Sequence, residues 1–156
     1  MRWLKAAYKD SKLFDYFVDN KIICSGSTMG EQVAMEAYLR AFAKEFDVTQ
    51  CIAKGCDQGL HNFLYYSSKL KGVKGISKVV LHEQGKSNVN NLAGLREKSL
   101  ADWDVLKRDG DVIIVSNWDG SISPVLHQVD RDKELNAHIN KLYRRKAQEW
   151  RRKSKP

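Results

Sequence analysis

The chain of 156 residues is about one domain long, and its 42% hydrophobic and 29% charged residues are typical of a globular protein with a core. Residues 141–156 carry eight Lys or Arg against one Glu (+7), whereas residues 1–140 carry nineteen basic and eighteen acidic residues (+1). This imbalance weighs against a nucleic-acid-binding face spread over the whole body. No apolar run reaches the roughly 20 residues of a membrane helix, and the first residues lack the apolar segment of a secretory signal.

The first half of the chain predicts two amphipathic helices that follow a short strand. A short helix is expected to end near Lys12–Val18, and a brief apolar strand at Lys21–Ser27 leads into a turn. Ser27 or Thr28 is expected to cap a helix that starts near Glu31. Its apolar face repeats at steps of four, through Val33, Ala37 and Ala41 and through Tyr38, Phe42 and Phe46. A second helix is expected over Asp57–Ser67, with Leu60, Phe63 and Leu64 facing inward.

The second half predicts strands and a long C-terminal helix. Ser77–Glu83 and the β-branched run Asp111–Ser116 indicate strands, and Gln84–Leu100 between them indicates a loop. The turn signal in NWDGS makes Ile122–Val129 the expected hairpin partner of the second strand. Helical spacing from Asp132 continues into a basic tail. We therefore expect an α/β fold, a mixed sheet with flanking helices, in one domain over 1–140 followed by a basic helix over 141–156.

The three cysteines are Cys24, Cys51 and Cys56. An odd number without CxxC spacing weighs against both a disulfide framework and a zinc site. We expect buried free thiols, because free cysteine behaves as a small apolar residue.

The stretch CSGSTMG, Cys24 to Gly30, is the first polar corner with chemical interest. Gly26 permits close approach of a ligand to the backbone, and the hydroxyls of Ser25, Ser27 and Thr28 are donors for a sugar or phosphate. An ordinary capped turn between a strand and a helix explains the same residues, and the motif alone does not decide between the two.

The second corner is GCDQGLHN, Gly55 to Asn62. Asp57 and Gln58 place a carboxylate and an amide at a helix start, and Gly59 is expected to keep the adjacent surface open. The structural alternative is that Asp57 caps the helix, which is worth about 0.5–2 kcal/mol.

Taken together, the two corners resemble the second half of GT-A-fold glycosyltransferases, in the glycogenin-like and related groups. In those enzymes a strand ends in a small N/S-x-G turn, and a helix separates it from a DQG-x-x-N motif. The matching residues here are Ser25 and Gly26, then Asp57, Gln58, Gly59 and Asn62. The resemblance implies that Asp57 and Gln58 are catalytic and that Ser25, Gly26, Ser27, Gly59 and Asn62 bind substrate.

The stretch SPVLHQVDRD, Ser123 to Asp132, extends the resemblance. It implies that His127 is a ligand of a divalent metal, Mn or Mg, bound to the nucleotide diphosphate. A core or surface histidine is the alternative. The Asp-x-Asp motif of the GT-A fold has no counterpart upstream of Cys24. Three Asp-x-Asp pairs lie downstream, in the wrong order, and are read as surface charge: Asp102 with Asp104, Asp109 with Asp111, and Asp130 with Asp132.

The expected activity is transfer of a sugar from a nucleotide-diphosphate sugar to a glycan or protein acceptor. The nucleotide-binding half and its metal carboxylates are expected from a partner or a longer parent chain, in the Golgi or endoplasmic reticulum. Two other interpretations stay open. The chain is a non-catalytic subunit that docks on a larger assembly, or it is an RNA-associated protein. In the latter, the basic residues after Leu142 contact phosphate and Trp150 stacks on a base.

Overall fold

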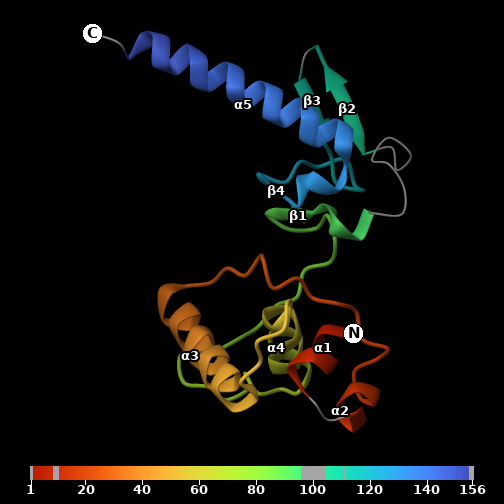
Figure 1. Ribbon diagram of the computed structural model, residues 1–156, viewed down its shortest axis with the longest axis vertical. Coiled ribbons are helices and arrows are strands. Elements are labelled where there is room, and N and C mark those ends of the chain that lie inside the picture. The colour runs from red at the N-terminus through yellow and green to blue at the C-terminus, as the bar shows by residue number, and fades with distance from the viewer. Residues whose placement is uncertain (1, 9–10, 96–104, 111, 155–156) are drawn as a thin grey trace. The chain divides into compact units, whose positions relative to one another are not determined.

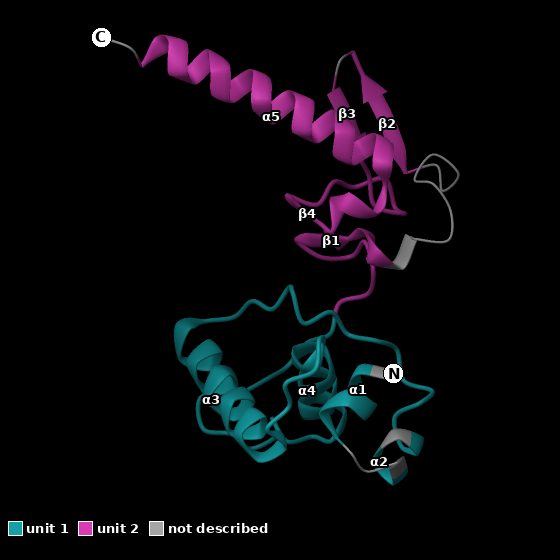
Figure 2. Cartoon of the chain, viewed as in Figure 1, with its two compact units in different colours: residues 1–81 teal, residues 82–156 magenta. Residues whose placement is uncertain are grey.

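The computed structural model describes residues 2–8, 11–95, 105–110 and 112–154. They form a mixed α/β structure that divides into two compact units, 1–81 and 82–156 (Figure 2). The domain boundary expected at residue 140 lies within a continuous helix, α5. Among the described helices, none has the length and apolar character needed to cross a membrane.

Unit 1 is helical in its described part. Its helices are α1 (Arg2–Ala7), α2 (Ser11–Asp15), α3 (Gln32–Thr49) and α4 (Cys56–Tyr66) (Figure 1). The two amphipathic helices predicted from sequence are confirmed as α3 and α4. The predicted cap of α3 is wrong, because the helix begins after Glu31 and has no side-chain cap. Residue Gly55, with φ +89°, precedes α4, so Asp57 lies one position inside the helix and does not cap it.

The core of unit 1 is built around α4. Leu60, Phe63 and Leu64 are buried, as predicted. α1 packs directly on this helix, and the contact depends on a glycine. A Cβ atom on Gly59 would lie 2.4 Å from the carbonyl oxygen of Trp3. Gly59 therefore permits close packing of α1 on α4, where we had expected it to keep a ligand surface open.

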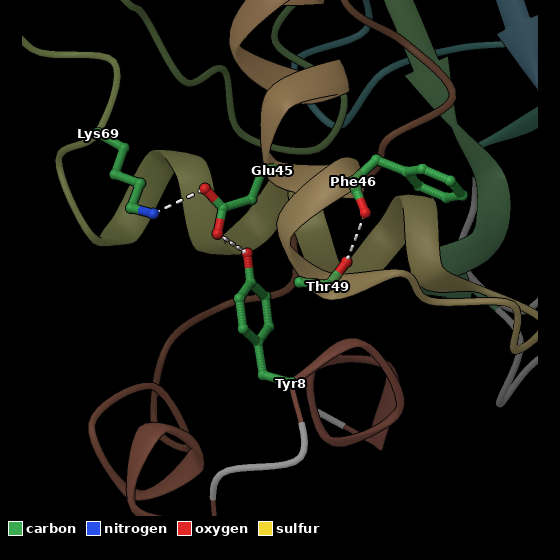
Figure 3. A network of polar contacts seen from close by, with 5 residues as sticks. All are labelled: Tyr8, Glu45, Phe46, Thr49 and Lys69. Carbon is green, nitrogen blue, oxygen red and sulfur yellow. Dashed lines mark hydrogen bonds and ion pairs between the residues drawn. The ribbon is translucent and has the colours of Figure 1, made fainter.

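A buried carboxylate ties three parts of unit 1 together (Figure 3). Glu45 of α3 is 5% exposed. Its Oε1 accepts a hydrogen bond from the Tyr8 hydroxyl at 2.6 Å, and its Oε2 pairs with Lys69 Nζ at 2.7 Å. Burial, followed by the hydrogen bond and the charge of Glu45, raises the pKa of Tyr8. Both oxygens of the carboxylate are thus partnered, as a buried charge requires.

The prediction of free thiols is wrong for two of the three cysteines. Cys51 and Cys56 form a disulfide, while Cys24 is a free thiol. The bond closes the turn between α3 and α4. The sequence rule failed because it looked for CxxC spacing. Gln50 and Gly55 have left-handed backbone conformations, and the CIAKGC loop folds back on itself so that its two cysteines meet.

The first two strands predicted from the sequence do not form. Residues 21–24 and 77–83 carry no strand, and no neighbouring strand of the described residues lies beside either segment. An apolar run becomes a strand only where a partner satisfies its backbone groups. The second segment leaves three consecutive aliphatic side chains exposed, Val79, Val80 and Leu81.

Unit 2 contains four short strands, β1 (Val89–Asn91), β2 (Leu106–Asp109), β3 (Val112–Val115) and β4 (Val125–His127). Two 3₁₀ turns accompany them, Leu92–Leu95 and Val129–Arg131, and α5 (Lys133–Lys153) closes the unit (Figure 1). In the described residues the strands form two separate pairs and not one mixed sheet.

The predicted hairpin was wrong in its partners. β3 pairs antiparallel with β2, whereas β4 pairs parallel with β1. β1 lies inside the segment predicted as a loop, of which residues 96–100 are outside the described part. The NWDGS turn does form, with the Gly120 N–H donating to the Asn117 carbonyl at 2.9 Å. The turn reverses the chain, but the next strand, β4, pairs with β1 and not with β3.

The core of unit 2 is small. Leu92, Val105, Val115 and Leu135 are its buried members. α5 begins where predicted, because the Asp132 side chain accepts a hydrogen bond from the Leu135 N–H at 2.9 Å and caps the helix. Residues 143–154 of its second half are all exposed.

Candidate carbohydrate-binding corner

The two polar corners that the sequence singles out meet in unit 1. Ser25 Oγ donates a hydrogen bond to Asp57 Oδ2 at 2.8 Å, and the Ser25 N–H donates to Gln58 Oε1 at 3.2 Å. The residues are separated by more than thirty positions, with all of α3 between them. The turn after residue 24 therefore lies against the first turn of α4.

Side chains of α4 hold this turn in place. Asn62 Oδ1 accepts from the Ile23 N–H and Asn62 Nδ2 donates to the Ile23 carbonyl, both at 2.8 Å. The Gln58 amide donates to the same carbonyl. These bonds take the place of the strand pairing that the sequence had predicted for this segment. Because Asn62 is only 3% exposed, its amide is an internal clamp.

A hollow of about 320 Å³ opens beside the Ser25–Asp57 contact. One part of its wall is polar and the other apolar, and the apolar part comes from α3. The lining residues are Ser25, Gly26, Thr28, Met35, Tyr38, Leu39, Phe42 and Asp57. A carboxylate, hydroxyl groups and an aromatic ring in one hollow are the groups that contact the hydroxyls and the C–H face of a sugar ring.

Tyr38 is held in the hollow by a buried histidine. Its hydroxyl lies 2.7 Å from His61 Nδ1, and His61 is 8% exposed. Burial raises the pKa of Tyr38 to about 12, although a hydrogen bond with Thr28 lowers it; the nearby charge of Asp57 raises it further. Burial lowers the pKa of His61, partly offset by Asp57. At neutral pH the phenol is therefore protonated and the imidazole neutral, and the two groups share one hydrogen bond.

Not every predicted site residue reaches the hollow. Of the set taken from the resemblance, Ser25, Gly26 and Asp57 line it, while Gln58 touches it only through Ser25. Ser27, Gly59 and Asn62 do not line it. Sequence reasoning missed Tyr38 and His61, which it treated as part of an apolar face or left aside. The available signal was that His61 follows Asp57 by four residues, so both lie on one side of α4.

The predicted metal ligand lies in the other unit. His127 is the last residue of β4, where it is paired with Asn91. Among the described residues no group of three or more His, Cys, Asp or Glu side chains is arranged to hold a metal ion. His127 therefore stays a predicted ligand only for a site whose carboxylates come from elsewhere, since hard cations need several oxygen ligands.

The downstream Asp-x-Asp pairs add no such carboxylates in the described part of the chain. Asp132 caps α5 and Asp130 lies 3.4 Å from Arg131. Asp109 is an exposed residue at the end of β2. The remaining members of these pairs, Asp102, Asp104 and Asp111, lie outside the described residues.

Comparison of the chain with protein-family models, with curated proteins and with solved structures finds no match.

Proposed function

We propose that the chain contributes the sugar-contacting part of a glycosyltransferase of GT-A type, which transfers a sugar from a nucleotide-diphosphate sugar to a glycan or protein acceptor. The observation that carries the proposal is the contact between Ser25 and Asp57 at the edge of a partly aromatic hollow. Residues that the resemblance assigns to one substrate site are thereby neighbours, although they are far apart in the sequence.

In this proposal Asp57 faces the transferred sugar. Its carboxylate is exposed and accepts from Ser25 through Oδ2, so Oδ1 is available to a sugar hydroxyl or to an acceptor hydroxyl that must lose a proton. Tyr38 supplies a ring against the C–H face of the sugar. Its hydroxyl, which shares a hydrogen bond with His61, lies beside the same hollow as Asp57.

The roles of Gln58 and Asn62 follow from their hydrogen bonds. Both amides are used on the backbone of residues 23–25, so we assign them to positioning Ser25 and not to binding sugar directly. The Cys51–Cys56 disulfide holds the start of α4 from the other side. A structural disulfide persists in oxidising compartments, which agrees with the Golgi or endoplasmic reticulum expected from the resemblance.

Ligand-dependent thermal stability tests the proposal. A ligand at 100 times its Kd stabilises the folded state by about 2.7 kcal/mol, so a matching nucleotide sugar or glycan acceptor should raise the Tm of the chain by several degrees. Manganese is included in the buffer. Asp57→Asn should abolish the shift, and Asp47→Asn on the exposed face of α3 is the control with the same chemical change. No shift with any donor or acceptor, or an equal shift in Asp57→Asn, would contradict the proposal.

A specific observation favours the second candidate, a subunit that docks on a larger assembly. Val79, Val80 and Leu81 are 46%, 55% and 42% exposed on a segment without strand pairing. An exposed apolar segment outside any strand pair is suited to strand addition by another protein. Replacing Val80 with Asp should abolish a stable complex isolated from cells without changing the Tm, whereas the sugar-dependent shift should be unaffected.

A further inference from the structure

A second and larger hollow lies within unit 2, between the turn of the β2–β3 hairpin and α5. Its volume is about 790 Å³. Six of its ten lining residues are cationic or amide residues, and these come from the end of β2 and from three successive turns of α5. The polar members are Arg108, His138, Asn140, Lys141, Arg144, Arg145 and Gln148, here called the basic groove.

The cations of the basic groove are available to a ligand. Lys141 and Arg144 make no ion pair with any other described residue. Arg108 pairs with Glu134, and Arg145 lies 3.8 Å from Glu149, in pairs whose side chains are 57–60% exposed. Exposed pairs of this kind contribute about 0–1 kcal/mol, so an incoming anion can replace the carboxylate at little cost.

The groove also contains polar groups that complement a mixed ligand. His138 Nε2 is buried and has no hydrogen-bond partner among the described residues. The amide of Gln148 offers both a donor and an acceptor beside the cations. A ligand that presents anionic oxygens next to groups that donate as well as accept satisfies this arrangement better than an acceptor-only anion.

We propose that the basic groove binds the ribose–phosphate backbone of single-stranded RNA, in which the phosphate oxygens accept and the 2′-hydroxyls both donate and accept hydrogen bonds. An arginine guanidinium can form two parallel hydrogen bonds with the oxygens of one phosphate. Proteins that bind single-stranded nucleic acid without sequence preference commonly use a positively charged groove that follows its backbone. From Lys141 to Gln148 the helix rises about 10 Å, which is enough for more than one phosphate. The hollow is too small for a duplex, and its concave form does not suit a flat membrane surface.

This placement differs from the RNA interpretation drawn from the tail alone. Trp150 is 70% and Tyr143 67% exposed, and neither lines the groove. Stacking on a base is therefore not part of the proposal, and we expect binding to be insensitive to base identity. The proposal does not depend on the sugar site, because the groove is built wholly from residues of unit 2.

Fluorescence anisotropy of a labelled single-stranded RNA of about 20 nucleotides tests the proposal over about 50–300 mM salt. The full chain should bind with a strong salt dependence. Lys141→Gln combined with Arg144→Gln should raise Kd about tenfold at low salt and reduce the slope of log K against log salt by about 1.4, which is about 0.7 for each lost phosphate contact. An abasic strand of equal length should bind with a Kd within about twofold of that RNA.

The matched control is Arg151→Gln combined with Arg152→Gln, which removes the same charge from the same helix outside the groove. It should leave most of the affinity in place. An equal loss of RNA affinity in both double variants would contradict binding in the groove. An unchanged slope of log K against log salt in the Lys141→Gln, Arg144→Gln variant would also contradict it. Two results would contradict a nucleic-acid ligand. One is that the wild-type chain shows no saturable binding to the RNA, and the other is that it binds heparin or phosphatidylserine vesicles more tightly than the RNA.

Discussion

The helices α4 and α5 use polar residues in opposite ways. α4 has seven buried residues among eleven, including His61 and Asn62, whereas Leu135 is the only buried residue among the twenty-one of α5. The polar groups of α4 are used on the protein's own backbone and side chains. Most of those of α5, with His138 as an exception, face solvent. The same residue types therefore build structure in the first helix and offer a surface in the second.

This difference changes how a motif is interpreted. In DQG-x-x-N, only Asp57 lies at the exposed end of α4, beside the hollow. The glycine and the asparagine of the motif are buried and serve packing and clamping. The motif thus has one residue exposed toward the hollow and several residues that hold the neighbouring turn in position.

The largest expected effect is loss of the clamp on α4. Asn62→Ala leaves the Ile23 N–H without its partner and removes one of the two amide donors to the Ile23 carbonyl, and we expect unfolding to become easier by about 2 kcal/mol. Asn136→Ala on α5 is the control, since its side-chain bond to Asn140 is exposed, and it should stay within about 0.5 kcal/mol of wild type. Urea unfolding measures the stability of both variants. Equal losses of stability would contradict the difference between the polar residues of α4 and those of α5.

A smaller effect is expected from acid. Because burial lowers the pKa of His61, the unfolded chain binds a proton at a higher pH than the folded chain. Stability should be fully present above pH 6.5 and should fall as the pH drops below 6.5 toward the lower pKa of the folded state. His61→Gln, whose amide can donate to or accept from the Tyr38 hydroxyl, should flatten this part of the profile. If His61→Gln leaves the dependence of stability on pH unchanged, a group other than His61 binds the proton that destabilises the folded chain.

The smallest effect is expected at the end of α5. Trp150→Ala removes the largest side chain of the exposed half of this helix, but it should change the free energy of unfolding by no more than about 0.5 kcal/mol. Thermal unfolding followed by circular dichroism is sufficient. A larger loss would mean that Trp150 packs on something, contrary to its exposure.

Helices could be predicted from the sequence far better than strands. The four-residue spacing in α3 and α4 and the helical spacing from Asp132 are local signals, and each element appears where they indicate. A strand depends on a partner that can be anywhere in the chain. The apolar runs at residues 21–24 and 77–83 had no partner, and β1 formed from a polar stretch that happened to lie beside β4.

The candidate site shows the same limit. The sequence contains the two corners, but the distance between them depends on how α3 packs and on the loop closed by Cys51 and Cys56. Tyr38 and His61 carry no motif, and only the fold brings them to Asp57. Likewise, Arg108 joins the cations of α5 because β2 ends beside that helix, which no local pattern in the sequence indicates.

The most direct test of the sugar site is a titration of isotope-labelled protein with the stabilising nucleotide sugar, followed by amide chemical-shift changes. The proposal predicts that the largest changes occur at Ser25, Gly26 and Asp57, with smaller ones at Tyr38, and that Asp57→Asn removes them. Changes confined to α5, or saturable binding that leaves the amides of Ser25 and Asp57 unmoved, would contradict it.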